Sequence, residues 1–293
     1  MSFYKSAPLV IVSALFILCC GVWTVVYAET PRLSGVLTFA VLDIGQGDGL
    51  YIEGPTGVQL LVDAGPHDGA VLRALPTVMP LGDRTLDAVI ETHPDADHMG
   101  GLVDVLERYE VGAFITAGIN KQNATIDALQ KEIDEQNIPR IIARRGMTLD
   151  LGGGARLDII YPDKDVSGYG NKTNDGSIMA HLVYGNTSVL LTADVPTNVE
   201  SYVMRIASTS ELASDILKVG HHGSKYSTSE KFVAEVSPKT AIISVGAKNS
   251  YGHPTERVLN TLSAQNISIL RTDENGTVRC VSDGAEFSCV TQK

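Results

Sequence analysis

Three apolar segments of this 293-residue chain each run directly into side chains of metal-binding types. The residues at the three ends are His93, Asp95, Asp97 and His98, then Asp194, then His221 and His222. A carboxylate at the end of a buried strand is unfavourable unless it is paired or binds a cation. Imidazole and carboxylate groups are common ligands of divalent metals. The sequence therefore predicts a fold in which several strand ends meet around a metal site.

The densest of these groups lies in the segment THPDADHMGG, residues 92–101, which follows the apolar run LDAVIET. Alternate residues that continue from a strand project to one side. We expect His93, Asp95 and Asp97 to share that side, with His98 at the start of the next helix. Four such donors can bind one ion or contribute to two. The alternative is an acidic helix cap with incidental histidines.

Asp194 ends the apolar run SVLLTAD, and we expect its carboxylate to bridge two metal ions. The alternative role for Asp194 is the N-cap of a helix over TNVESY. His253 lies just before a helix that Pro254 begins, so it also belongs to a loop that follows an apolar strand. We interpret the remaining histidines, His67 and His181, as structural.

Composition limits the partners of this chain. A hydrophobic content of 44% and a charged content of 19% fit a globular domain with a sizeable core. The formal net charge of -11 argues against a broad basic surface that grips duplex nucleic acid. It does not exclude a phosphodiester substrate, because bound metal ions would reverse the sign of the charge inside a cleft.

Strand-like and helical segments alternate along residues 31–293, and the second half of this region repeats the texture of the first. Strands come first in each half and helices follow, without a repeat or a low-complexity tract. This pattern favours one domain of two packed mixed sheets with helices on the outside.

Residues 1–30 form a separate N-terminal segment, with an uncharged apolar run from Ala7 to Ala28. About 20 apolar residues are enough to cross a bilayer as a helix. We expect a membrane anchor at 7–28, with the domain outside the cytoplasm on a single-pass cell-membrane protein. One alternative is a signal peptide cleaved before Glu29, which would release a secreted domain. Another is a buried core helix.

Cys280 and Cys289 flank the turn signal Ser282-Asp283-Gly284 between two β-like runs. The two cysteines could face each other across a terminal hairpin, and a disulfide there is plausible outside the reducing cytosol. The alternative is a pair of reduced, half-buried thiols.

Eight segments together resemble the metallo-β-lactamase fold, and specifically the soluble domain of ComEC-type competence (DNA-uptake) membrane proteins. In chain order they are LDIGQGD (42–48), LLVDAG (60–65), THPDADHMGG (92–101), NDGS (174–177), LLTAD (190–194), LKVGHHGS (217–224), SVGAKNSYGHP (244–254) and RTDENGTV (271–278). The resemblance implies an α/β (α+β) fold, a four-layer αββα sandwich with a dinuclear metal cleft, preceded here by one N-terminal apolar helix.

The resemblance also implies a set of metal ligands. His93 and Asp95 would hold one ion, Asp97 and His98 would hold the other, Asp194 would bridge the two, and His221 would complete the second. The two divalent ions would be Zn²⁺ or Mn²⁺. Asp95 stands where the wider superfamily has a histidine, and this harder donor makes manganese a rival to zinc.

Further roles follow from the same resemblance. Catalytic contributions are implied for Asp97, His222 and His253, with the last two as candidates for substrate contact or proton donation. Asn174, Ser177 and Ser224 would bind substrate or water, and Asp63 would orient a ligand histidine. Asp43 and Asp48 belong to a loop at the rim, where a purely structural turn is the alternative.

These observations favour a metal-dependent hydrolase, most simply a phosphodiesterase or nuclease acting on single-stranded DNA in competence-type uptake. ComEC-type proteins carry a multi-span channel, whereas one span is expected here, so the protein would either work with a separately encoded DNA channel or have lost uptake. One alternative is a hydrolase of another phosphodiester, a lactam, a lactone or a thioester, since fold alone does not choose the substrate. A second alternative is a non-catalytic, membrane-tethered binding module.

Overall fold

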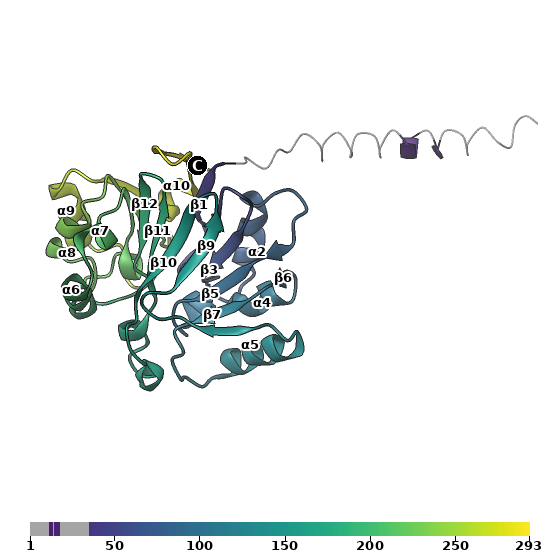
Figure 1. The fold of residues 1–293 in the computed structure, drawn as a ribbon, viewed down its shortest axis with the longest axis horizontal. Coiled ribbons are helices and arrows are strands. Elements are labelled where there is room, and N and C mark those ends of the chain that lie inside the picture. The colour runs from purple at the N-terminus through teal and green to yellow at the C-terminus, as the bar shows by residue number, and fades with distance from the viewer. Residues whose placement is uncertain (1–11, 14, 18–34) are drawn as a thin grey trace, which may run out of the picture.

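The computed structural model describes residues 12–13, 15–17 and 35–293. Two large β-sheets pack against each other, and helices cover the outer face of each sheet (Figure 1). The α/β sandwich predicted from the sequence is confirmed in this arrangement of layers.

The eight-stranded sheet contains the N-terminal half of the domain together with the last two strands. Its order is β17-β16-β1-β2-β3-β5-β7-β8. The strands are β1 Leu37–Val41, β2 Leu50–Glu53, β3 Gln59–Val62, β5 Ala88–Glu91, β7 Phe114–Thr116, β8 Arg140–Ile142, β16 Val278–Ser282 and β17 Phe287–Thr291. β3, β5, β7 and β8 are parallel, and the remaining neighbours are antiparallel.

The seven-stranded sheet has the order β15-β14-β13-β12-β11-β10-β9. Its strands are β9 Thr148–Gly152, β10 Ala155–Tyr161, β11 Met179–Tyr184, β12 Thr187–Leu191, β13 Ile216–Lys218, β14 Thr240–Ile243 and β15 Ser268–Arg271. The last four are parallel neighbours, so their carboxyl ends meet at one edge of the sheet. A small two-stranded sheet pairs β4 Thr85–Leu86 with β6 Glu110–Val111.

The helices divide between the two outer layers (Figure 1). On the eight-stranded sheet lie α2 Ala70–Ala74, α3 Ala96–Met99, α4 Leu102–Leu106 and α5 Ala124–Glu135; on the other lie α6 Thr197–Ile206, α7 Thr209–Leu212, α8 Glu230–Val236, α9 Glu256–Ala264 and α10 Thr272–Asn275. Short 3₁₀ turns complete the list: η1 Leu75–Thr77, η2 Ser167–Tyr169, η3 Thr173–Gly176 and η4 Gly220–Gly223.

The alternation of side chains along each strand builds the core between the sheets. In β1, Phe39 faces the inter-sheet core, where Leu157 and Val189 of the other sheet also lie, whereas Ala40 faces the helices. Both faces of β1 are covered, so all five of its residues are buried and Thr38 is its one polar residue. Truncation of Phe39 to alanine would cost about 3–5 kcal/mol of stability.

The helix expected after the HPDADH segment is interrupted at Gly100 and Gly101, between α3 and α4. A Cβ added at Gly101 would lie 2.3 Å from the carbonyl oxygen of Ala64, and Gly101 N donates to Gly65 O at 2.9 Å. The glycine pair therefore lets the helix backbone approach the end of β3, which fixes the position of the segment 93–98. The sequence pattern alone did not indicate this break.

The terminal hairpin has the predicted form. β16 and β17 pair antiparallel with Cys280 opposite Cys289, and the two sulfurs form a disulfide. The predicted membrane segment 7–28 lies outside the described residues, except at 12–13 and 15–17, which are helical. Among the described residues, no helix combines the length and apolar character that a membrane crossing requires.

Candidate metal centre

The candidate centre forms where strand ends of both sheets meet. β5 of the eight-stranded sheet leads into His93 and the segment 93–98. β12 leads into Asp194, and the parallel neighbour β13 leads through η4 into His221 and His222. Parallel strands that end at one edge are a common setting for binding sites in α/β sheets.

Asp194 is the point at which the other groups converge. Its Oδ2 atom lies 3.3 Å from His98 Nε2 and 3.6 Å from His222 Nε2. His222 Nε2 in turn lies 3.5 Å from Asp97 Oδ2. The ligand atoms of His93, His98 and Asp194 lie within 4.8 Å of one another, as do those of Asp97, His98 and His222. The two groups share His98.

Several side-chain nitrogen and oxygen atoms at this centre are buried and have no hydrogen-bond partner among the described residues. They are the Nε2 atoms of His93, His98 and His222, and Oδ1 of Asp194 and of Asp48. An unpartnered buried polar atom costs about 1–3 kcal/mol, so proteins rarely retain several together without a ligand. Nitrogen and oxygen donors that converge on one space fit a divalent cation. The residues present therefore suit a metal centre.

Contacts behind the histidines fix their orientation. His98 Nδ1 contacts Asp63 Oδ2 at 2.8 Å, and His222 Nδ1 donates to the carbonyl oxygen of Ser244 at 2.9 Å. Asp63 also accepts hydrogen bonds from Thr92 N and Thr92 Oγ1. Each contact holds Nδ1 and leaves Nε2 directed at Asp194, the usual arrangement behind metal-binding histidines. Asp63 thus lies behind a histidine of the cluster, the position that the family resemblance implied for it.

The electrostatics of the cluster favour a bound cation. Burial opposes the ionisation of Asp194, but His98 and His222 outweigh it and hold the pKa of Asp194 well below its usual range. Burial likewise opposes ionisation of Asp97, yet His222 and His98 lower its pKa to about 2. Burial lowers the pKa of His93 to about 4, so its ring is neutral. Both carboxylates are therefore charged at neutral pH.

Asp95 is only partly directed at the cluster. Its Oδ1 accepts from Lys121 Nζ at 2.5 Å and from Thr173 Oγ1 at 2.8 Å. Its Oδ2 lies 3.6 Å from His93 Nε2. Asp95 belongs to neither group of converging ligand atoms, so the predicted ligand has one oxygen committed to protein contacts and one oriented toward His93.

The two consecutive histidines both lie near Asp194 but differ in burial. His222 is buried with its Nε2 toward Asp97 and Asp194, whereas His221 is 27% exposed and its Nε2 lies 3.7 Å from Asp194 Oδ2. Both residues have positive φ angles, and their rings are inclined by 83°. The Nε2 atom of His222 therefore belongs to the buried group with Asp97 and His98. His221 lies at the rim with its ring 5.7 Å from that of His253, and Asn174 Nδ2 lies 3.4 Å from its Nδ1.

Three other predicted site residues have structural roles here. Ser177 is fully buried and donates to Thr173 O, and Ser224 is 2% exposed and accepts from Tyr226 N, so both of these predicted substrate- or water-binding side chains are buried and bonded within the protein. Asp43 forms an ion pair with Lys293 at 2.8 Å, away from the cluster, which supports the structural alternative. Asp48, in contrast, lies directly behind His222, with its Oδ1 3.5 Å from Nδ1.

Sequence reasoning missed Lys218, which is fully buried at the end of β13. Its Nζ donates to Asp48 Oδ2 at 2.8 Å and to Val219 O at 3.1 Å. The signal was available, because one lysine inside the apolar run DILKVG requires a buried partner. Lys121 left no such signal, since it lies in a polar loop.

Residues 42–247 match the metallo-beta-lactamase superfamily, so this chain belongs to that superfamily. Its relatives include competence proteins. It is 30% identical over 278 residues to ComE operon protein 3 of Bacillus subtilis, covering 89% of this chain and 35% of that protein. It is 32% identical over 242 residues to competence protein ComA of Neisseria gonorrhoeae, covering 82% and 31%. The chain thus spans about a third of the length of these relatives.

Two solved structures share the fold. CmlA, a diiron beta-hydroxylase from Streptomyces venezuelae, has a TM-score of 0.52 at 14% identity over 83% of this chain and 53% of its own. Tm1679, a metal-dependent hydrolase of the beta-lactamase superfamily, has a TM-score of 0.51 at 15% identity over 80% and 95%. At this identity the likeness shows the fold alone.

Proposed function

We propose that this protein is a divalent-metal-dependent phosphodiesterase that hydrolyses single-stranded DNA. The observation that carries the proposal is the convergence of unpartnered, buried nitrogen and oxygen atoms around Asp194. Such a set suits metal-assisted hydrolysis. The likeness to competence proteins favours DNA as the substrate over a lactam or thioester.

The ligands divide into two sets in this proposal. Asp97, His98 and His222 would hold one ion, and His93 with Asp95 Oδ2 would hold the other, while Asp194 would serve both. Zn²⁺ or Mn²⁺ bound there would act as a Lewis acid on the phosphoryl group and would activate water. His222 thus takes the ligand role expected for His221.

The protein's own groups orient the site and handle protons. Asp63 and the Ser244 carbonyl hold Nδ1 of His98 and His222, so that each Nε2 stays available. His221 lies at the exposed rim and is our candidate to protonate the leaving oxygen. Burial, with help from His221 and His222, lowers the pKa of His253, so this ring is neutral near pH 7 and suits hydrogen bonding to substrate.

We also propose that the domain works outside the cytoplasm, held by the apolar segment 7–28 and acting beside a separately encoded channel. The disulfide between Cys280 and Cys289 supports this location, because such bonds are rare in the reducing cytosol. An alkaline phosphatase fused after Lys293 should be active in intact cells. An inactive fusion at normal expression would contradict the location.

The activity is tested with the full-length protein, purified in detergent, stripped with chelator and reloaded with Mn²⁺ or Zn²⁺. We expect cleavage of a single-stranded oligonucleotide and of bis-p-nitrophenyl phosphate, but no turnover of nitrocefin. Asp194→Asn should reduce turnover more than tenfold, because it removes the charge at which both ligand sets meet. Asp158→Asn, at a carboxylate paired with Arg156 on β10, is the matched control.

Two results would reject this function. Cleavage of nitrocefin alone would identify a hydrolase of a different substrate class. A protein that binds well under one equivalent of metal, and that stays inert with every added ion, would be a binding module rather than an enzyme.

A further inference from the structure

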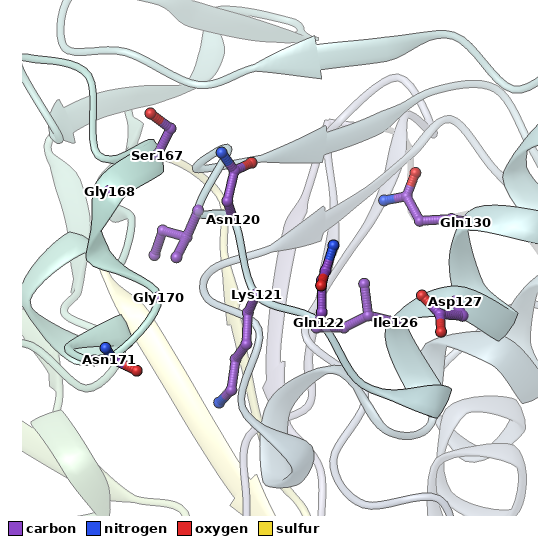
Figure 2. Close-up of a pocket in the computed structure, with 11 residues that line it drawn as sticks. Asn120, Lys121, Gln122, Ile126, Asp127, Gln130, Ser167, Gly168, Gly170 and Asn171 are labelled. Atoms are coloured by element: carbon purple, nitrogen blue, oxygen red, sulfur yellow. The ribbon is translucent and has the colours of Figure 1, made fainter.

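A cavity of about 1030 Å³ is lined in part by Lys121, whose ammonium contacts Asp95 beside the candidate metal centre. Asn120 and Lys121 lie in its middle, α5 with Gln122 lies on one side, and the segment 167–171 lies on the other (Figure 2). Typical small-molecule sites have volumes of roughly 300–1,000 Å³, so this space can hold more than a single small group.

Amide side chains dominate the cavity. Gln122, Gln130 and Asn171 line it, and none of these three side chains hydrogen-bonds to any other residue in the part of the chain that the structure describes. Each amide offers both a donor and an acceptor. The cavity lining has a net charge near zero, because it contains one cationic side chain, Lys121, and one anionic side chain, Asp127. The lining therefore suits a polar ligand with mixed donors and acceptors more than a dense array of phosphates.

The cavity connects to the metal centre through Asp95. Lys121 lines the cavity, and its Nζ lies 2.5 Å from Asp95 Oδ1. The wall at 167–171 continues into Thr173, which donates to the same oxygen, and into Asn174 beside His221. Contacts of Lys121 and Thr173 with Asp95 therefore join the cavity walls to the cluster.

Backbone contacts hold the loop at Asn120 against the segment 167–171. Asn120 N donates to Ser167 O at 3.0 Å, and a Cβ added at Gly170 would lie 2.2 Å from Asn120 O. Gly168 differs, because a Cβ added there meets no atom within 4 Å. A large side chain at position 168 can thus enter open space without disturbing the backbone contact at Gly170.

We propose that this cavity binds the nucleotides on one side of the phosphodiester bond that reaches the metal centre. The inference rests on the proposed function, since it names where the rest of the single-stranded substrate lies. Unpaired bases present donor and acceptor edges that amides can read, whereas duplex bases have those edges occupied. The cavity therefore selects single strands through base edges, which agrees with a chain of net charge -11.

The test measures binding separately from cleavage. The full-length protein is kept in excess chelator, and a fluorescein-labelled single-stranded oligonucleotide of about 12 nucleotides, within the usual range of single-strand sites, is titrated by anisotropy. Gly168→Trp adds an indole at the cavity wall, where a side chain meets open space, and the double change Gln122→Ala with Gln130→Ala removes two amides. We expect each variant to raise Kd at least tenfold, and duplex DNA of the same sequence to bind wild type at least tenfold more weakly.

Two controls match these changes. Gln265→Ala removes an amide at the end of α9, and Ala285→Trp adds an exposed indole in the terminal hairpin. Both should keep the wild-type Kd. Wild-type affinity in the cavity variants, or no binding by wild type, would overturn the inference. Binding that depends on the cavity, without hydrolysis after Mn²⁺ or Zn²⁺ is restored, would instead reject the proposed function and leave the cavity assignment standing.

Discussion

Lys218 Nζ lies 2.8 Å from Asp48 Oδ2, and both side chains are almost completely excluded from solvent. The other oxygen of Asp48 lies 3.5 Å from His222 Nδ1, so this ion pair underlies the candidate metal centre. Burial opposes the ionisation of Asp48, but the Lys218 ammonium together with His222 and His98 outweighs it, and the pKa of Asp48 lies well below its usual range. The pair therefore fixes a negative charge behind a histidine of the cluster.

Removal of one partner of this pair should destabilise the fold. Lys218→Met leaves a buried carboxylate uncompensated, and we expect a loss of about 3–5 kcal/mol in the free energy of unfolding. The double variant Lys218→Met with Asp48→Asn should recover part of this loss, because no charge remains buried alone. Urea unfolding of the metal-free protein at pH 7 measures both.

Lys239→Met at the surface provides the control for that experiment. Lys239 pairs with Asp215 at 2.8 Å but is 83% exposed, and exposed ion pairs contribute little to stability. Equal losses in the Lys218 and Lys239 variants would contradict a structural role for the buried pair.

The ligands at strand ends were predictable because apolar runs that stop at a histidine or carboxylate are visible in a single sequence. Asp194 and His98 lie where that reasoning placed them, and the layered fold follows from the alternation of strands and helices. Asp63 could be placed behind a ligand histidine only through family resemblance, since nothing local in VDAG indicates its partner.

Which of His221 and His222 directs its Nε2 into the buried group with Asp97 and His98 was not predictable from the sequence. Both residues adopt left-handed backbone conformations, with φ of 50° and 54°, which non-glycine residues rarely do. The direction of each ring depends on that local geometry and not on residue type. The contact between Lys121 and Asp95 joins two loops 26 residues apart, and a charge in a polar loop does not identify its partner.

The assignment of the consecutive histidines predicts different metal affinities for two alanine variants. His222→Ala removes an Nε2 atom from the group with Asp97 and His98, so we expect at least a tenfold loss of Mn²⁺ or Zn²⁺ affinity. His221→Ala removes a rim residue and should bind metal like wild type while turnover falls. Isothermal titration with elemental analysis measures the metal affinity of both variants. Equal losses of affinity would reject the assignment of His222, and not His221, as the ligand.

The terminal disulfide should make stability sensitive to reductant. Cys280 and Cys289 are nine residues apart in sequence, and closing a loop of that size contributes roughly 2–3 kcal/mol on chain-entropy grounds. We expect dithiothreitol to lower the thermal midpoint of wild type by several degrees. The variant Cys280→Ser with Cys289→Ser should start from the lower midpoint and show no response. A wild-type midpoint that does not change would contradict a stabilising bond.

Metal binding should release protons and strengthen as pH rises. In the metal-free cluster, burial opposes protonation of His222, but Asp194, Asp48 and Asp97 outweigh it and raise its pKa to about 9. Below that pH a metal must displace a proton from the ring, so each displaced proton should raise affinity about tenfold per pH unit between pH 6 and 8.

His98, whose pKa is also raised well above its usual value by Asp194 and Asp63 against the effect of burial, should release a second proton. Titration calorimetry in buffers of different ionisation enthalpy counts these protons directly. His67→Ala changes an exposed histidine paired with Asp104 and should leave the count unchanged. Affinity independent of pH across this range would show that the two rings are already neutral in the metal-free protein. In that case His98 and His222 would not carry the positive charges that lower the pKa values of Asp194 and Asp97.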